Sequence, residues 1–227
     1  MFVFFDIGST LLDGPSQGPA RRLASLFGLP EEMRRPLNDF LLRAPLDGPR
    51  ALADYLASRC DADPDAARDA SDTLWKTQRE ESRAIPGARE SLQRLWTAGI
   101  PYGFLSNIWS PFYQGFESLF REEIRDKPRI LSFEVGLAKP DTALYETALA
   151  ALSLLPQETI MVGDTYANDM APAMALGMKT VWVLRRPDKE HLDIVRVLDG
   201  ELPAPGRTLA SIEQLKPDII HSLFTTR

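Results

Sequence analysis

Residues 2–10 read FVFFDIGST, a wholly apolar run that stops at an acidic residue and continues into a Gly-Ser-Thr segment. A run without polar alternation is typical of a parallel strand that is buried on both faces. The polar residues after it are typical of the loop at the carboxyl end of such a strand. We therefore predict that the first strand spans residues 2–5 and that Asp6 lies at its end.

Outward from this strand, residues 17–83 differ in character. Ala, Arg, Leu and Asp recur there at helical spacing without a convincing strand pattern. Asp47 and Asp63 stand where helix N-caps are expected. We predict an all-helical insert of three or four helices, which ends near Arg83 because Ile85-Pro86-Gly87 breaks the helical pattern.

From residue 84 onward, apolar runs alternate with amphipathic segments, which is typical of a doubly wound α/β fold with a parallel sheet. The predicted strands are 102–105, 130–133, 159–162 and 180–184, and the predicted helices are 111–120, 142–151 and 171–176. The helix before residue 99 is predicted to turn Trp96 inward, and 201–207 is predicted to be a loop. We predict a Rossmann-like core domain of residues 1–16 and 84–227 and a helical domain of residues 17–83.

Composition narrows the class of protein. The chain has 227 residues, of which 44% are hydrophobic, so it can bury an α/β core with a small additional domain. Its net charge is −6 and its basic residues are scattered, which argues against nucleic acid as a partner. Cys60 is the only cysteine, the apolar N-terminus lacks a basic flank, and no apolar run could span a membrane. We expect a cytoplasmic protein without a membrane partner, whose oligomeric state the sequence leaves unknown.

Polar residues follow the predicted strands at the edge where ligands bind in open parallel sheets. They are Asp6, Ser106, Asn107, Lys139, Asp164 and Asp169. Carboxylates favour Mg²⁺, which neutralises phosphate charge, whereas a lysine and a hydroxyl group bind phosphate oxygens. We therefore predict that Ser106 and Lys139 bind a phosphoryl group, and that Asp6 attacks its phosphorus to form an aspartyl-phosphate.

Four segments, FFDIGSTLLD, GFLSN, GLAKPD and IMVGDTYANDM, resemble in order and spacing the four motifs of the haloacid dehalogenase (HAD) superfamily. Together they cover residues 2 to about 184. The resemblance implies a Mg²⁺-dependent phosphatase-like hydrolase in which Asp169 acts outside the direct metal ligands or through water. The implied catalytic residues are Asp6, Ser106 and Lys139, the implied substrate-binding residues are Ser106, Asn107 and Lys139, and the implied metal site comprises Asp6, Gly8 through its backbone carbonyl, Asp164 and Asp169.

The helical segment between the first two motifs resembles the cap of family members that act on small molecules. Such a cap closes over the site and excludes water, which implies a small phosphorylated metabolite as substrate. Arginines of this segment are candidates for binding an anionic leaving group, and the sequence does not say which of them points inward. They are Arg34, Arg35, Arg43 and Arg50.

The chain departs from the family pattern at Gly8. Most phosphatases of this kind carry a second aspartate there, which protonates the leaving group and later activates water. General acid–base catalysis contributes about 10²- to 10⁴-fold in rate. Three interpretations stay open: a substrate with a good leaving group, recruitment of another acid such as Asp13, or a protein that binds and barely turns over. Related phosphonate-cleaving enzymes use a cap lysine, for which Lys76 is the candidate.

Two other functions stay open as well. A metal-independent 2-haloacid dehalogenase would use an aspartate equivalent to Asp6 to attack carbon, and a non-catalytic protein would keep the phosphate pocket without turnover. The aromatic residues Trp109, Phe112 and Tyr113 are expected mainly to pack in the core. The charged run at residues 185–191 is expected to be a solvated loop.

Overall fold

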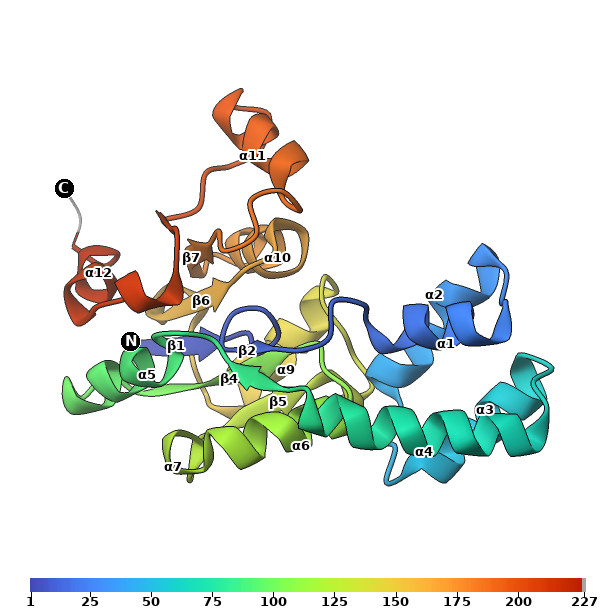
Figure 1. Cartoon of the computed structure of the whole chain (residues 1–227). Coiled ribbons are helices and arrows are strands. Elements are labelled where there is room, and N and C mark those ends of the chain that lie inside the picture. Colours follow the sequence, from blue (N-terminus) through green and yellow to red (C-terminus); the bar gives the residue numbers. More distant parts are fainter. Residues whose placement is uncertain (226–227) are drawn as a thin grey trace.

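The computed structural model describes residues 1–225 and contains a six-stranded parallel sheet of order β5-β4-β1-β6-β7-β8 (Figure 1). Its strands are β1 (Phe2–Phe5), β4 (Tyr102–Ser106), β5 (Arg129–Leu131), β6 (Thr159–Gly163), β7 (Lys179–Val183) and β8 (Arg207–Leu209). The chain runs outward from β1 to one edge and then returns to continue toward the other. This is the predicted doubly wound α/β fold, and β1 lies in the middle of the sheet.

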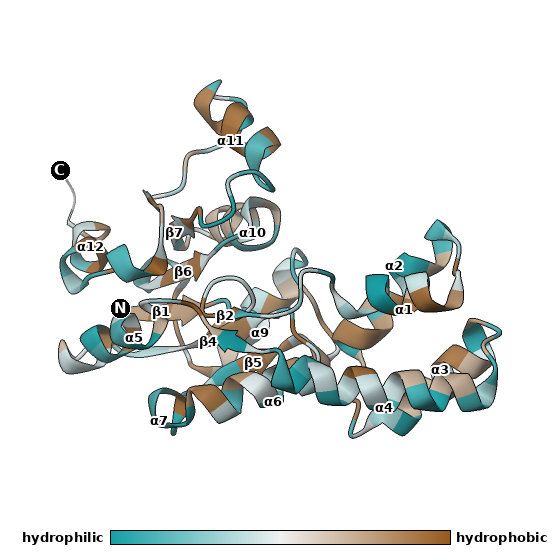
Figure 2. Cartoon of the chain, in the orientation of Figure 1, coloured by the Kyte–Doolittle hydropathy of each residue, from teal (hydrophilic) through white to brown (hydrophobic). Residues whose placement is uncertain are grey.

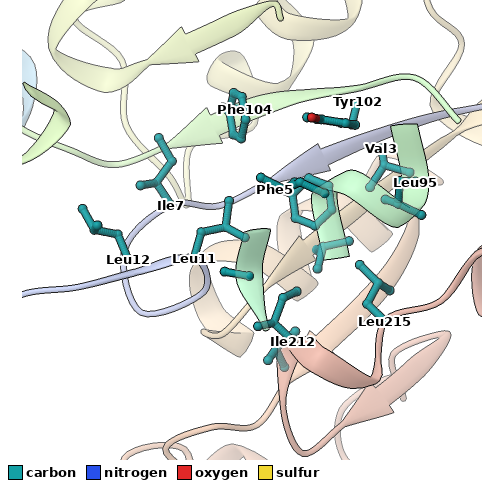
Figure 3. Packing of buried hydrophobic residues seen from close by; sticks show 14 of the residues in the cluster. Val3, Phe5, Ile7, Leu11, Leu12, Leu95, Tyr102, Phe104, Ile212 and Leu215 are labelled. Carbon is teal, nitrogen blue, oxygen red and sulfur yellow. The ribbon is translucent and has the colours of Figure 1, made fainter. Parts of the chain in front are cut away.

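Helices cover both faces of the sheet. One face carries α5 (Ala88–Thr97), α6 (Ser110–Leu119) and α12 (Pro217–Ser222), and the other carries α9 (Thr142–Ala151), α10 (Ala171–Ala175) and α11 (His191–Leu198). Val3 and Phe5 pack on the first face, near Leu95 of α5 (Figure 3), whereas Phe2 and Phe4 pack on the second. Both faces of β1 are therefore buried, which explains why its sequence lacks polar alternation.

The remaining short elements connect these layers. They are α7 (Arg121–Ile124), α8 (Ser132–Val135), η1 (Pro156–Glu158), η2 (Tyr166–Met170, a π-helical segment) and η3 (Ile212–Gln214). Two of them carry or adjoin predicted motifs: α8 leads from the carboxyl end of β5 into GLAKPD, and η2 forms the last five residues of IMVGDTYANDM. Within residues 1–225, no helix is long and apolar enough to cross a membrane.

Residues 19–80 form four helices, α1 (Pro19–Phe27), α2 (Glu31–Arg43), α3 (Pro49–Arg59) and α4 (Pro64–Glu80). They enclose a separate apolar cluster, and α4 also packs along α6 of the core (Figure 1). Teal and brown segments alternate along α4 in Figure 2, as expected for a helix with one buried face. Asp63 caps α4 by accepting a hydrogen bond from the backbone N–H of Ala66 at 2.9 Å. The predicted cap at Asp47 is wrong, because α3 begins after Gly48.

A two-stranded antiparallel ribbon marks the point where the chain leaves and re-enters the core. Its strands are β2 (Leu12–Asp13) and β3 (Arg83–Ala84). The last two residues of the first predicted motif are therefore paired with the residues at which the chain returns from the helical segment. This ribbon brings the loop after β1 next to the C-terminal end of α4.

Local predictions differ from the structure in three places. The strand predicted over 130–133 ends at Leu131, and α8 begins at the next residue. The loop predicted over 201–207 is confirmed for residues 201–206, but the edge strand β8, which starts at Arg207 and pairs with β7, was not predicted. Trp96 is 63% exposed rather than turned inward, and the Lys127 ammonium lies 3.3 Å from the centre of its indole ring. An edge strand and an exposed tryptophan both depend on neighbours remote in sequence, which a local hydrophobic pattern does not contain.

Candidate active site

Three adjacent strands bring the predicted motifs together. Asp6 follows β1, Ser106 is the last residue of β4 and Asp164 follows β6. Because β4 and β6 both pair with β1 in parallel, their carboxyl ends meet at one edge of the sheet. The segment after α8 brings Lys139 to the same point, and η2 brings Asp169. The sequence-predicted residues are thus assembled around Asp6.

Lys139 lies at the centre of this cluster and is 5% exposed. Its ammonium is 2.7 Å from Asp6 Oδ1 and 2.5 Å from Asp169 Oδ1, and it also donates to the Leu105 carbonyl at 3.1 Å. The Ser106 hydroxyl donates to the same Asp6 oxygen at 3.0 Å. Lys139 therefore holds two buried carboxylates in fixed positions, while Ser106 helps to orient Asp6 through the oxygen that Lys139 also binds.

Asp169 is positioned from two directions. Its Oδ1 atom accepts from Lys139, and its Oδ2 atom accepts from the backbone N–H of Thr165 at 3.0 Å. A Cβ atom at residue 163 would overlap the Asp169 carboxyl group, so only glycine allows this close approach. Gly163 in the fourth motif therefore has a steric reason, because a side chain there would displace the Asp169 carboxyl group.

Asp164 pairs with an arginine that the sequence analysis missed. Its Oδ2 atom forms an ion pair with Arg186, and the neighbouring Arg185 forms an ion pair with Asp13. The expectation of a solvated loop over residues 185–191 is therefore wrong for its first two members. A signal was present, since Arg186 follows β7 and the strand-end rule applied to the other motifs also covers this strand.

Asp6, Asp164 and Asp169 offer carboxylate oxygens that all lie within 4.8 Å of one another, and all three residues are buried. Burial, with a further contribution from Asp6, raises the pKa of Asp164 to about 6. Burial also raises the pKa of Asp169. For Lys139, burial opposes the charged form, yet the carboxylates of Asp169 and Asp6 raise its pKa above the ordinary value. Three carboxylates face the two cations Lys139 and Arg186, which leaves an excess of one negative charge, and a hard divalent cation fits this oxygen donor set.

Gly8 is not in the left-handed region that favours glycine, whereas the neighbouring Ser9 is, with a φ of 61°. A Cβ atom at residue 8 would lie 3.7 Å from Phe112 Cε1, an ordinary van der Waals contact. The position therefore has room for a Cβ atom. Neither strain nor crowding at this atom explains the glycine at the position where the resemblance to the HAD motifs implies an aspartate.

Asn107 was predicted to bind substrate, and in the structure its amide is engaged elsewhere. Its Nδ2 atom donates to the Lys139 carbonyl and its Oδ1 atom accepts from the Lys139 N–H, both at 2.8 Å. This two-point contact fixes the backbone of the lysine that holds Asp6. Asn107 thus positions Lys139, and its contact with substrate stays a prediction.

A cleft of about 430 Å³ opens beside the loop after β1. It lies between the core and the four-helix segment, and its lining includes Leu12, Asp13, Gly14, Asn38, Leu41, Gln78, Asn107, Ile108, Trp109, Phe112, Arg186 and Lys189. None of the four arginines predicted as candidates for an anionic leaving group lines it, and neither does Lys76. Arg43 instead donates to the Gly136 carbonyl at 3.2 Å and so ties α2 to the core.

Aromatic residues after the second motif have two roles. Tyr113 packs in the core as expected, whereas Trp109 and Phe112 both pack against neighbours and line the cleft. A larger hollow of about 810 Å³ lies between α1 and α4, and it contains none of the predicted site residues. The smaller cleft is therefore the space that adjoins the cluster around Asp6.

Comparison with known proteins identifies the family. The chain is 31% identical over 192 residues to the glyceraldehyde 3-phosphate phosphatase of Pyrococcus furiosus, and the match covers 79% of each chain. The chain belongs to the HAD superfamily. A family model described as HAD-hydrolase-like matches residues 136–192. The phosphoserine phosphatase of Thermus thermophilus is 30% identical over 60% of this chain and 55% of its own length.

Solved structures agree on the fold of this HAD protein. A 2-haloacid dehalogenase from Pseudomonas syringae has a TM-score of 0.62 at 19% identity, covering 97% of this chain and 98% of its own. A HAD family hydrolase from Deinococcus radiodurans, solved with phosphate and sodium, has a TM-score of 0.61 at 23% identity, covering 99% and 97%. The predicted family and fold are therefore confirmed, and the protein is a phosphatase-like hydrolase of phosphoric monoesters.

Proposed function

We propose that this HAD phosphatase is Mg²⁺-dependent and hydrolyses a small phosphorylated metabolite through an aspartyl-phosphate on Asp6. The observation that carries the proposal is the cluster in which Lys139 holds Asp6 and Asp169. A carboxylate oxygen of Asp164 lies within 4.8 Å of carboxylate oxygens of both residues. Curated relatives are named for glyceraldehyde 3-phosphate, phosphoserine and ribulose-1,5-bisphosphate. All three compounds are small phosphate esters, which supports a small substrate.

The donor set fits Mg²⁺, and Asp6, Asp164 and Asp169 would hold it together with the backbone carbonyl of Gly8. When bound, the cation would neutralise charge on the phosphoryl group and on the three carboxylates. Lys139 would contribute a second positive charge at the same point. Electrostatic compensation of this kind is the main contribution that a protein makes to phosphoryl transfer.

The reaction would proceed in two displacements. In the first, an Asp6 carboxylate oxygen attacks phosphorus, the bond between phosphorus and the leaving-group oxygen breaks, and that oxygen takes a proton from water in the cleft. In the second, water attacks phosphorus, the bond to Asp6 breaks, and inorganic phosphate leaves. Ser106, Lys139 and Asp6 keep their positions through both steps because each has a buried partner.

The first displacement needs a proton at the leaving group, and the second needs a base for water. Gly8 has no side chain to supply either. We propose that breakdown of the aspartyl-phosphate is consequently slow and limits turnover. We also propose that the helical segment of residues 17–83 acts as the cap that shields the intermediate, since its helices α2 and α4 contribute Asn38, Leu41 and Gln78 to the cleft wall.

The test is hydrolysis of an aryl phosphate with a good leaving group, measured with Mg²⁺, with excess chelator, and for Asp6→Asn. We expect metal-dependent turnover that the substitution abolishes. A burst of the released phenol should precede it, with an initial rate above the steady-state rate. A linear trace with fast turnover would contradict slow breakdown. Activity that persists in chelator would favour the metal-independent dehalogenase alternative, and no turnover at all would favour a non-catalytic phosphate-binding protein.

A further inference from the structure

Arg186 lies at the border between the carboxylate cluster and the cleft. Its guanidinium group forms an ion pair with Oδ2 of Asp164, and its side chain, which is 31% exposed, also lines the cleft. The Asp164 side chain is only 5% exposed and supplies one of the three carboxylates that fit a divalent cation. Arg186 therefore occupies part of the candidate metal site while it remains open to the cleft.

The segment that carries Arg186 is anchored on both sides of it. Before it, Arg185 forms an ion pair with Asp13 of the two-stranded ribbon. After it, Glu190 Oε2 accepts a hydrogen bond from the backbone N–H of Tyr166 at 2.7 Å. These contacts hold the backbone of the segment in place. Rotation of the Arg186 side chain alone is therefore enough to separate its guanidinium group from the carboxylate cluster.

A bound cation and the Arg186 guanidinium group compete for the same carboxylate. Two positive charges repel strongly at a site that is this poorly solvated, so metal binding favours release of the guanidinium group. Among the residues that line the cleft, Asp13 alone is acidic, and Arg185 already pairs with it. Lys189 lines the cleft as well. A released Arg186 therefore adds a positive charge that no carboxylate of the cleft lining balances.

We propose that Arg186 is a further phosphate-binding residue, which Asp164 holds in the metal-free protein and which metal binding releases into the cleft. The inference rests on the proposed function and adds a residue to its site. A carboxylate oxygen of Asp164 lies within 4.8 Å of one of Asp6, so a phosphoryl group at Asp6 is within reach of a side chain that contacts Asp164. A planar guanidinium group binds phosphate oxygens through two parallel hydrogen bonds. Part of the cooperativity between metal and phosphate therefore passes through Arg186.

The test measures the Kd of inorganic phosphate by titration calorimetry, once with saturating Mg²⁺ and once with excess chelator. With Mg²⁺, Arg186→Gln should weaken phosphate binding about 10-fold, because charge-assisted hydrogen bonds are lost. With chelator, the loss should be less than about 3-fold, because Asp164 keeps the wild-type guanidinium group from binding phosphate. Lys189→Gln is the matched control, since this exposed lysine lines the cleft but takes no part in the ion pair with Asp164. Its loss should be the same in both conditions.

Asp164→Asn should produce the same release without a metal ion, because it removes the carboxylate that holds the guanidinium group. In chelator, the double variant Asp164→Asn/Arg186→Gln should therefore bind phosphate about 10-fold more weakly than Asp164→Asn alone. The double variant also avoids leaving a buried carboxylate without its cation, since both charges are absent from it.

Equal losses for Arg186→Gln with Mg²⁺ and with chelator would overturn the inference, and so would equal phosphate affinities of Asp164→Asn and the double variant. If wild-type protein binds no Mg²⁺ and hydrolyses no aryl phosphate, the proposed function fails and the inference fails with it. If aryl phosphate is hydrolysed with Mg²⁺ while phosphate affinity does not respond to Arg186, only the inference fails.

Discussion

The cluster around Asp6 and the buried part of the cleft differ in how their polar groups are satisfied. Around Asp6, every charge has a partner within the chain: Lys139 between Asp6 and Asp169, and Arg186 on Asp164. In the cleft, Gln78 Oε1 and Trp109 Nε1 have none within residues 1–225. The first region is assembled before any ligand arrives, which suits catalysis by preorganised charge. The second is a mainly apolar wall whose buried polar atoms are not all paired by the chain itself.

Gly8 lies between these two regions, and filling it tests whether the charged cluster lacks only an acid–base group. Gly8→Asp should raise the steady rate of aryl phosphate hydrolysis by about 10²-fold or more and remove the burst, because breakdown of the intermediate would no longer limit turnover. The space at the Cβ position permits the substitution. Gly8→Asn is the matched control, since it has a similar size but cannot shuttle a proton. Equal rates in both variants would show that the missing aspartate is not what limits the enzyme.

Lys139 is the element on which the preorganised cluster depends most. Lys139→Met should lower the free energy of unfolding of the metal-free protein by about 3–5 kcal/mol, because it leaves Asp6 and Asp169 buried without their shared cation. Chemical denaturation measures this loss. Lys76→Met, which removes an exposed lysine 4.0 Å from Glu80, should change stability by less than about 0.5 kcal/mol. Similar stabilities for the two variants would mean that the cluster is not strongly coupled to folding.

The carboxylates should also make metal-free stability depend on pH. Because burial raises the pKa of Asp164 to about 6, the folded state binds more protons than the unfolded chain between about pH 4 and 6. The free energy of unfolding should therefore fall by up to about 3 kcal/mol as the pH rises through this window. Saturating Mg²⁺ at pH 7 should restore most of the loss, and Asp164→Asn should lose less than wild type. Urea unfolding at several pH values measures all three, and a rise in stability with pH would refute the assignment.

The smallest expected effect concerns Arg186. Because its guanidinium group occupies Asp164 Oδ2, Arg186→Gln should tighten Mg²⁺ binding about 3- to 10-fold by removing a competing positive charge. Titration calorimetry of the metal measures this change directly. Arg185→Gln is the control, since the adjacent arginine pairs with Asp13 instead. Weaker binding in Arg186→Gln would mean that the arginine holds Asp164 in place for the metal rather than competing with it.

Sequence reasoning succeeded where the location of a residue follows from its place at the end of a strand. The wholly apolar run FVFF predicted a central strand, and the residues after β1, β4 and β6 were brought together because parallel strands end at one edge. The same rule, applied to β7, would have identified Arg186. The rule also located Asn107 at the site, where its amide holds the Lys139 backbone.

The cleft shows what the sequence by itself did not determine. The amino-acid sequence determined the alternation of strands and helices in the core, the HAD motifs and the position of Gly8, because each can be recognised from residues close together along the chain. Only the tertiary structure shows that Gln78 lines the cleft and that none of the four candidate arginines does. The packing of α4 along α6 decides which side chains of the helical segment face the loop after β1. A helical pattern identifies a buried face, but the neighbour that buries it is chosen by contacts remote in sequence.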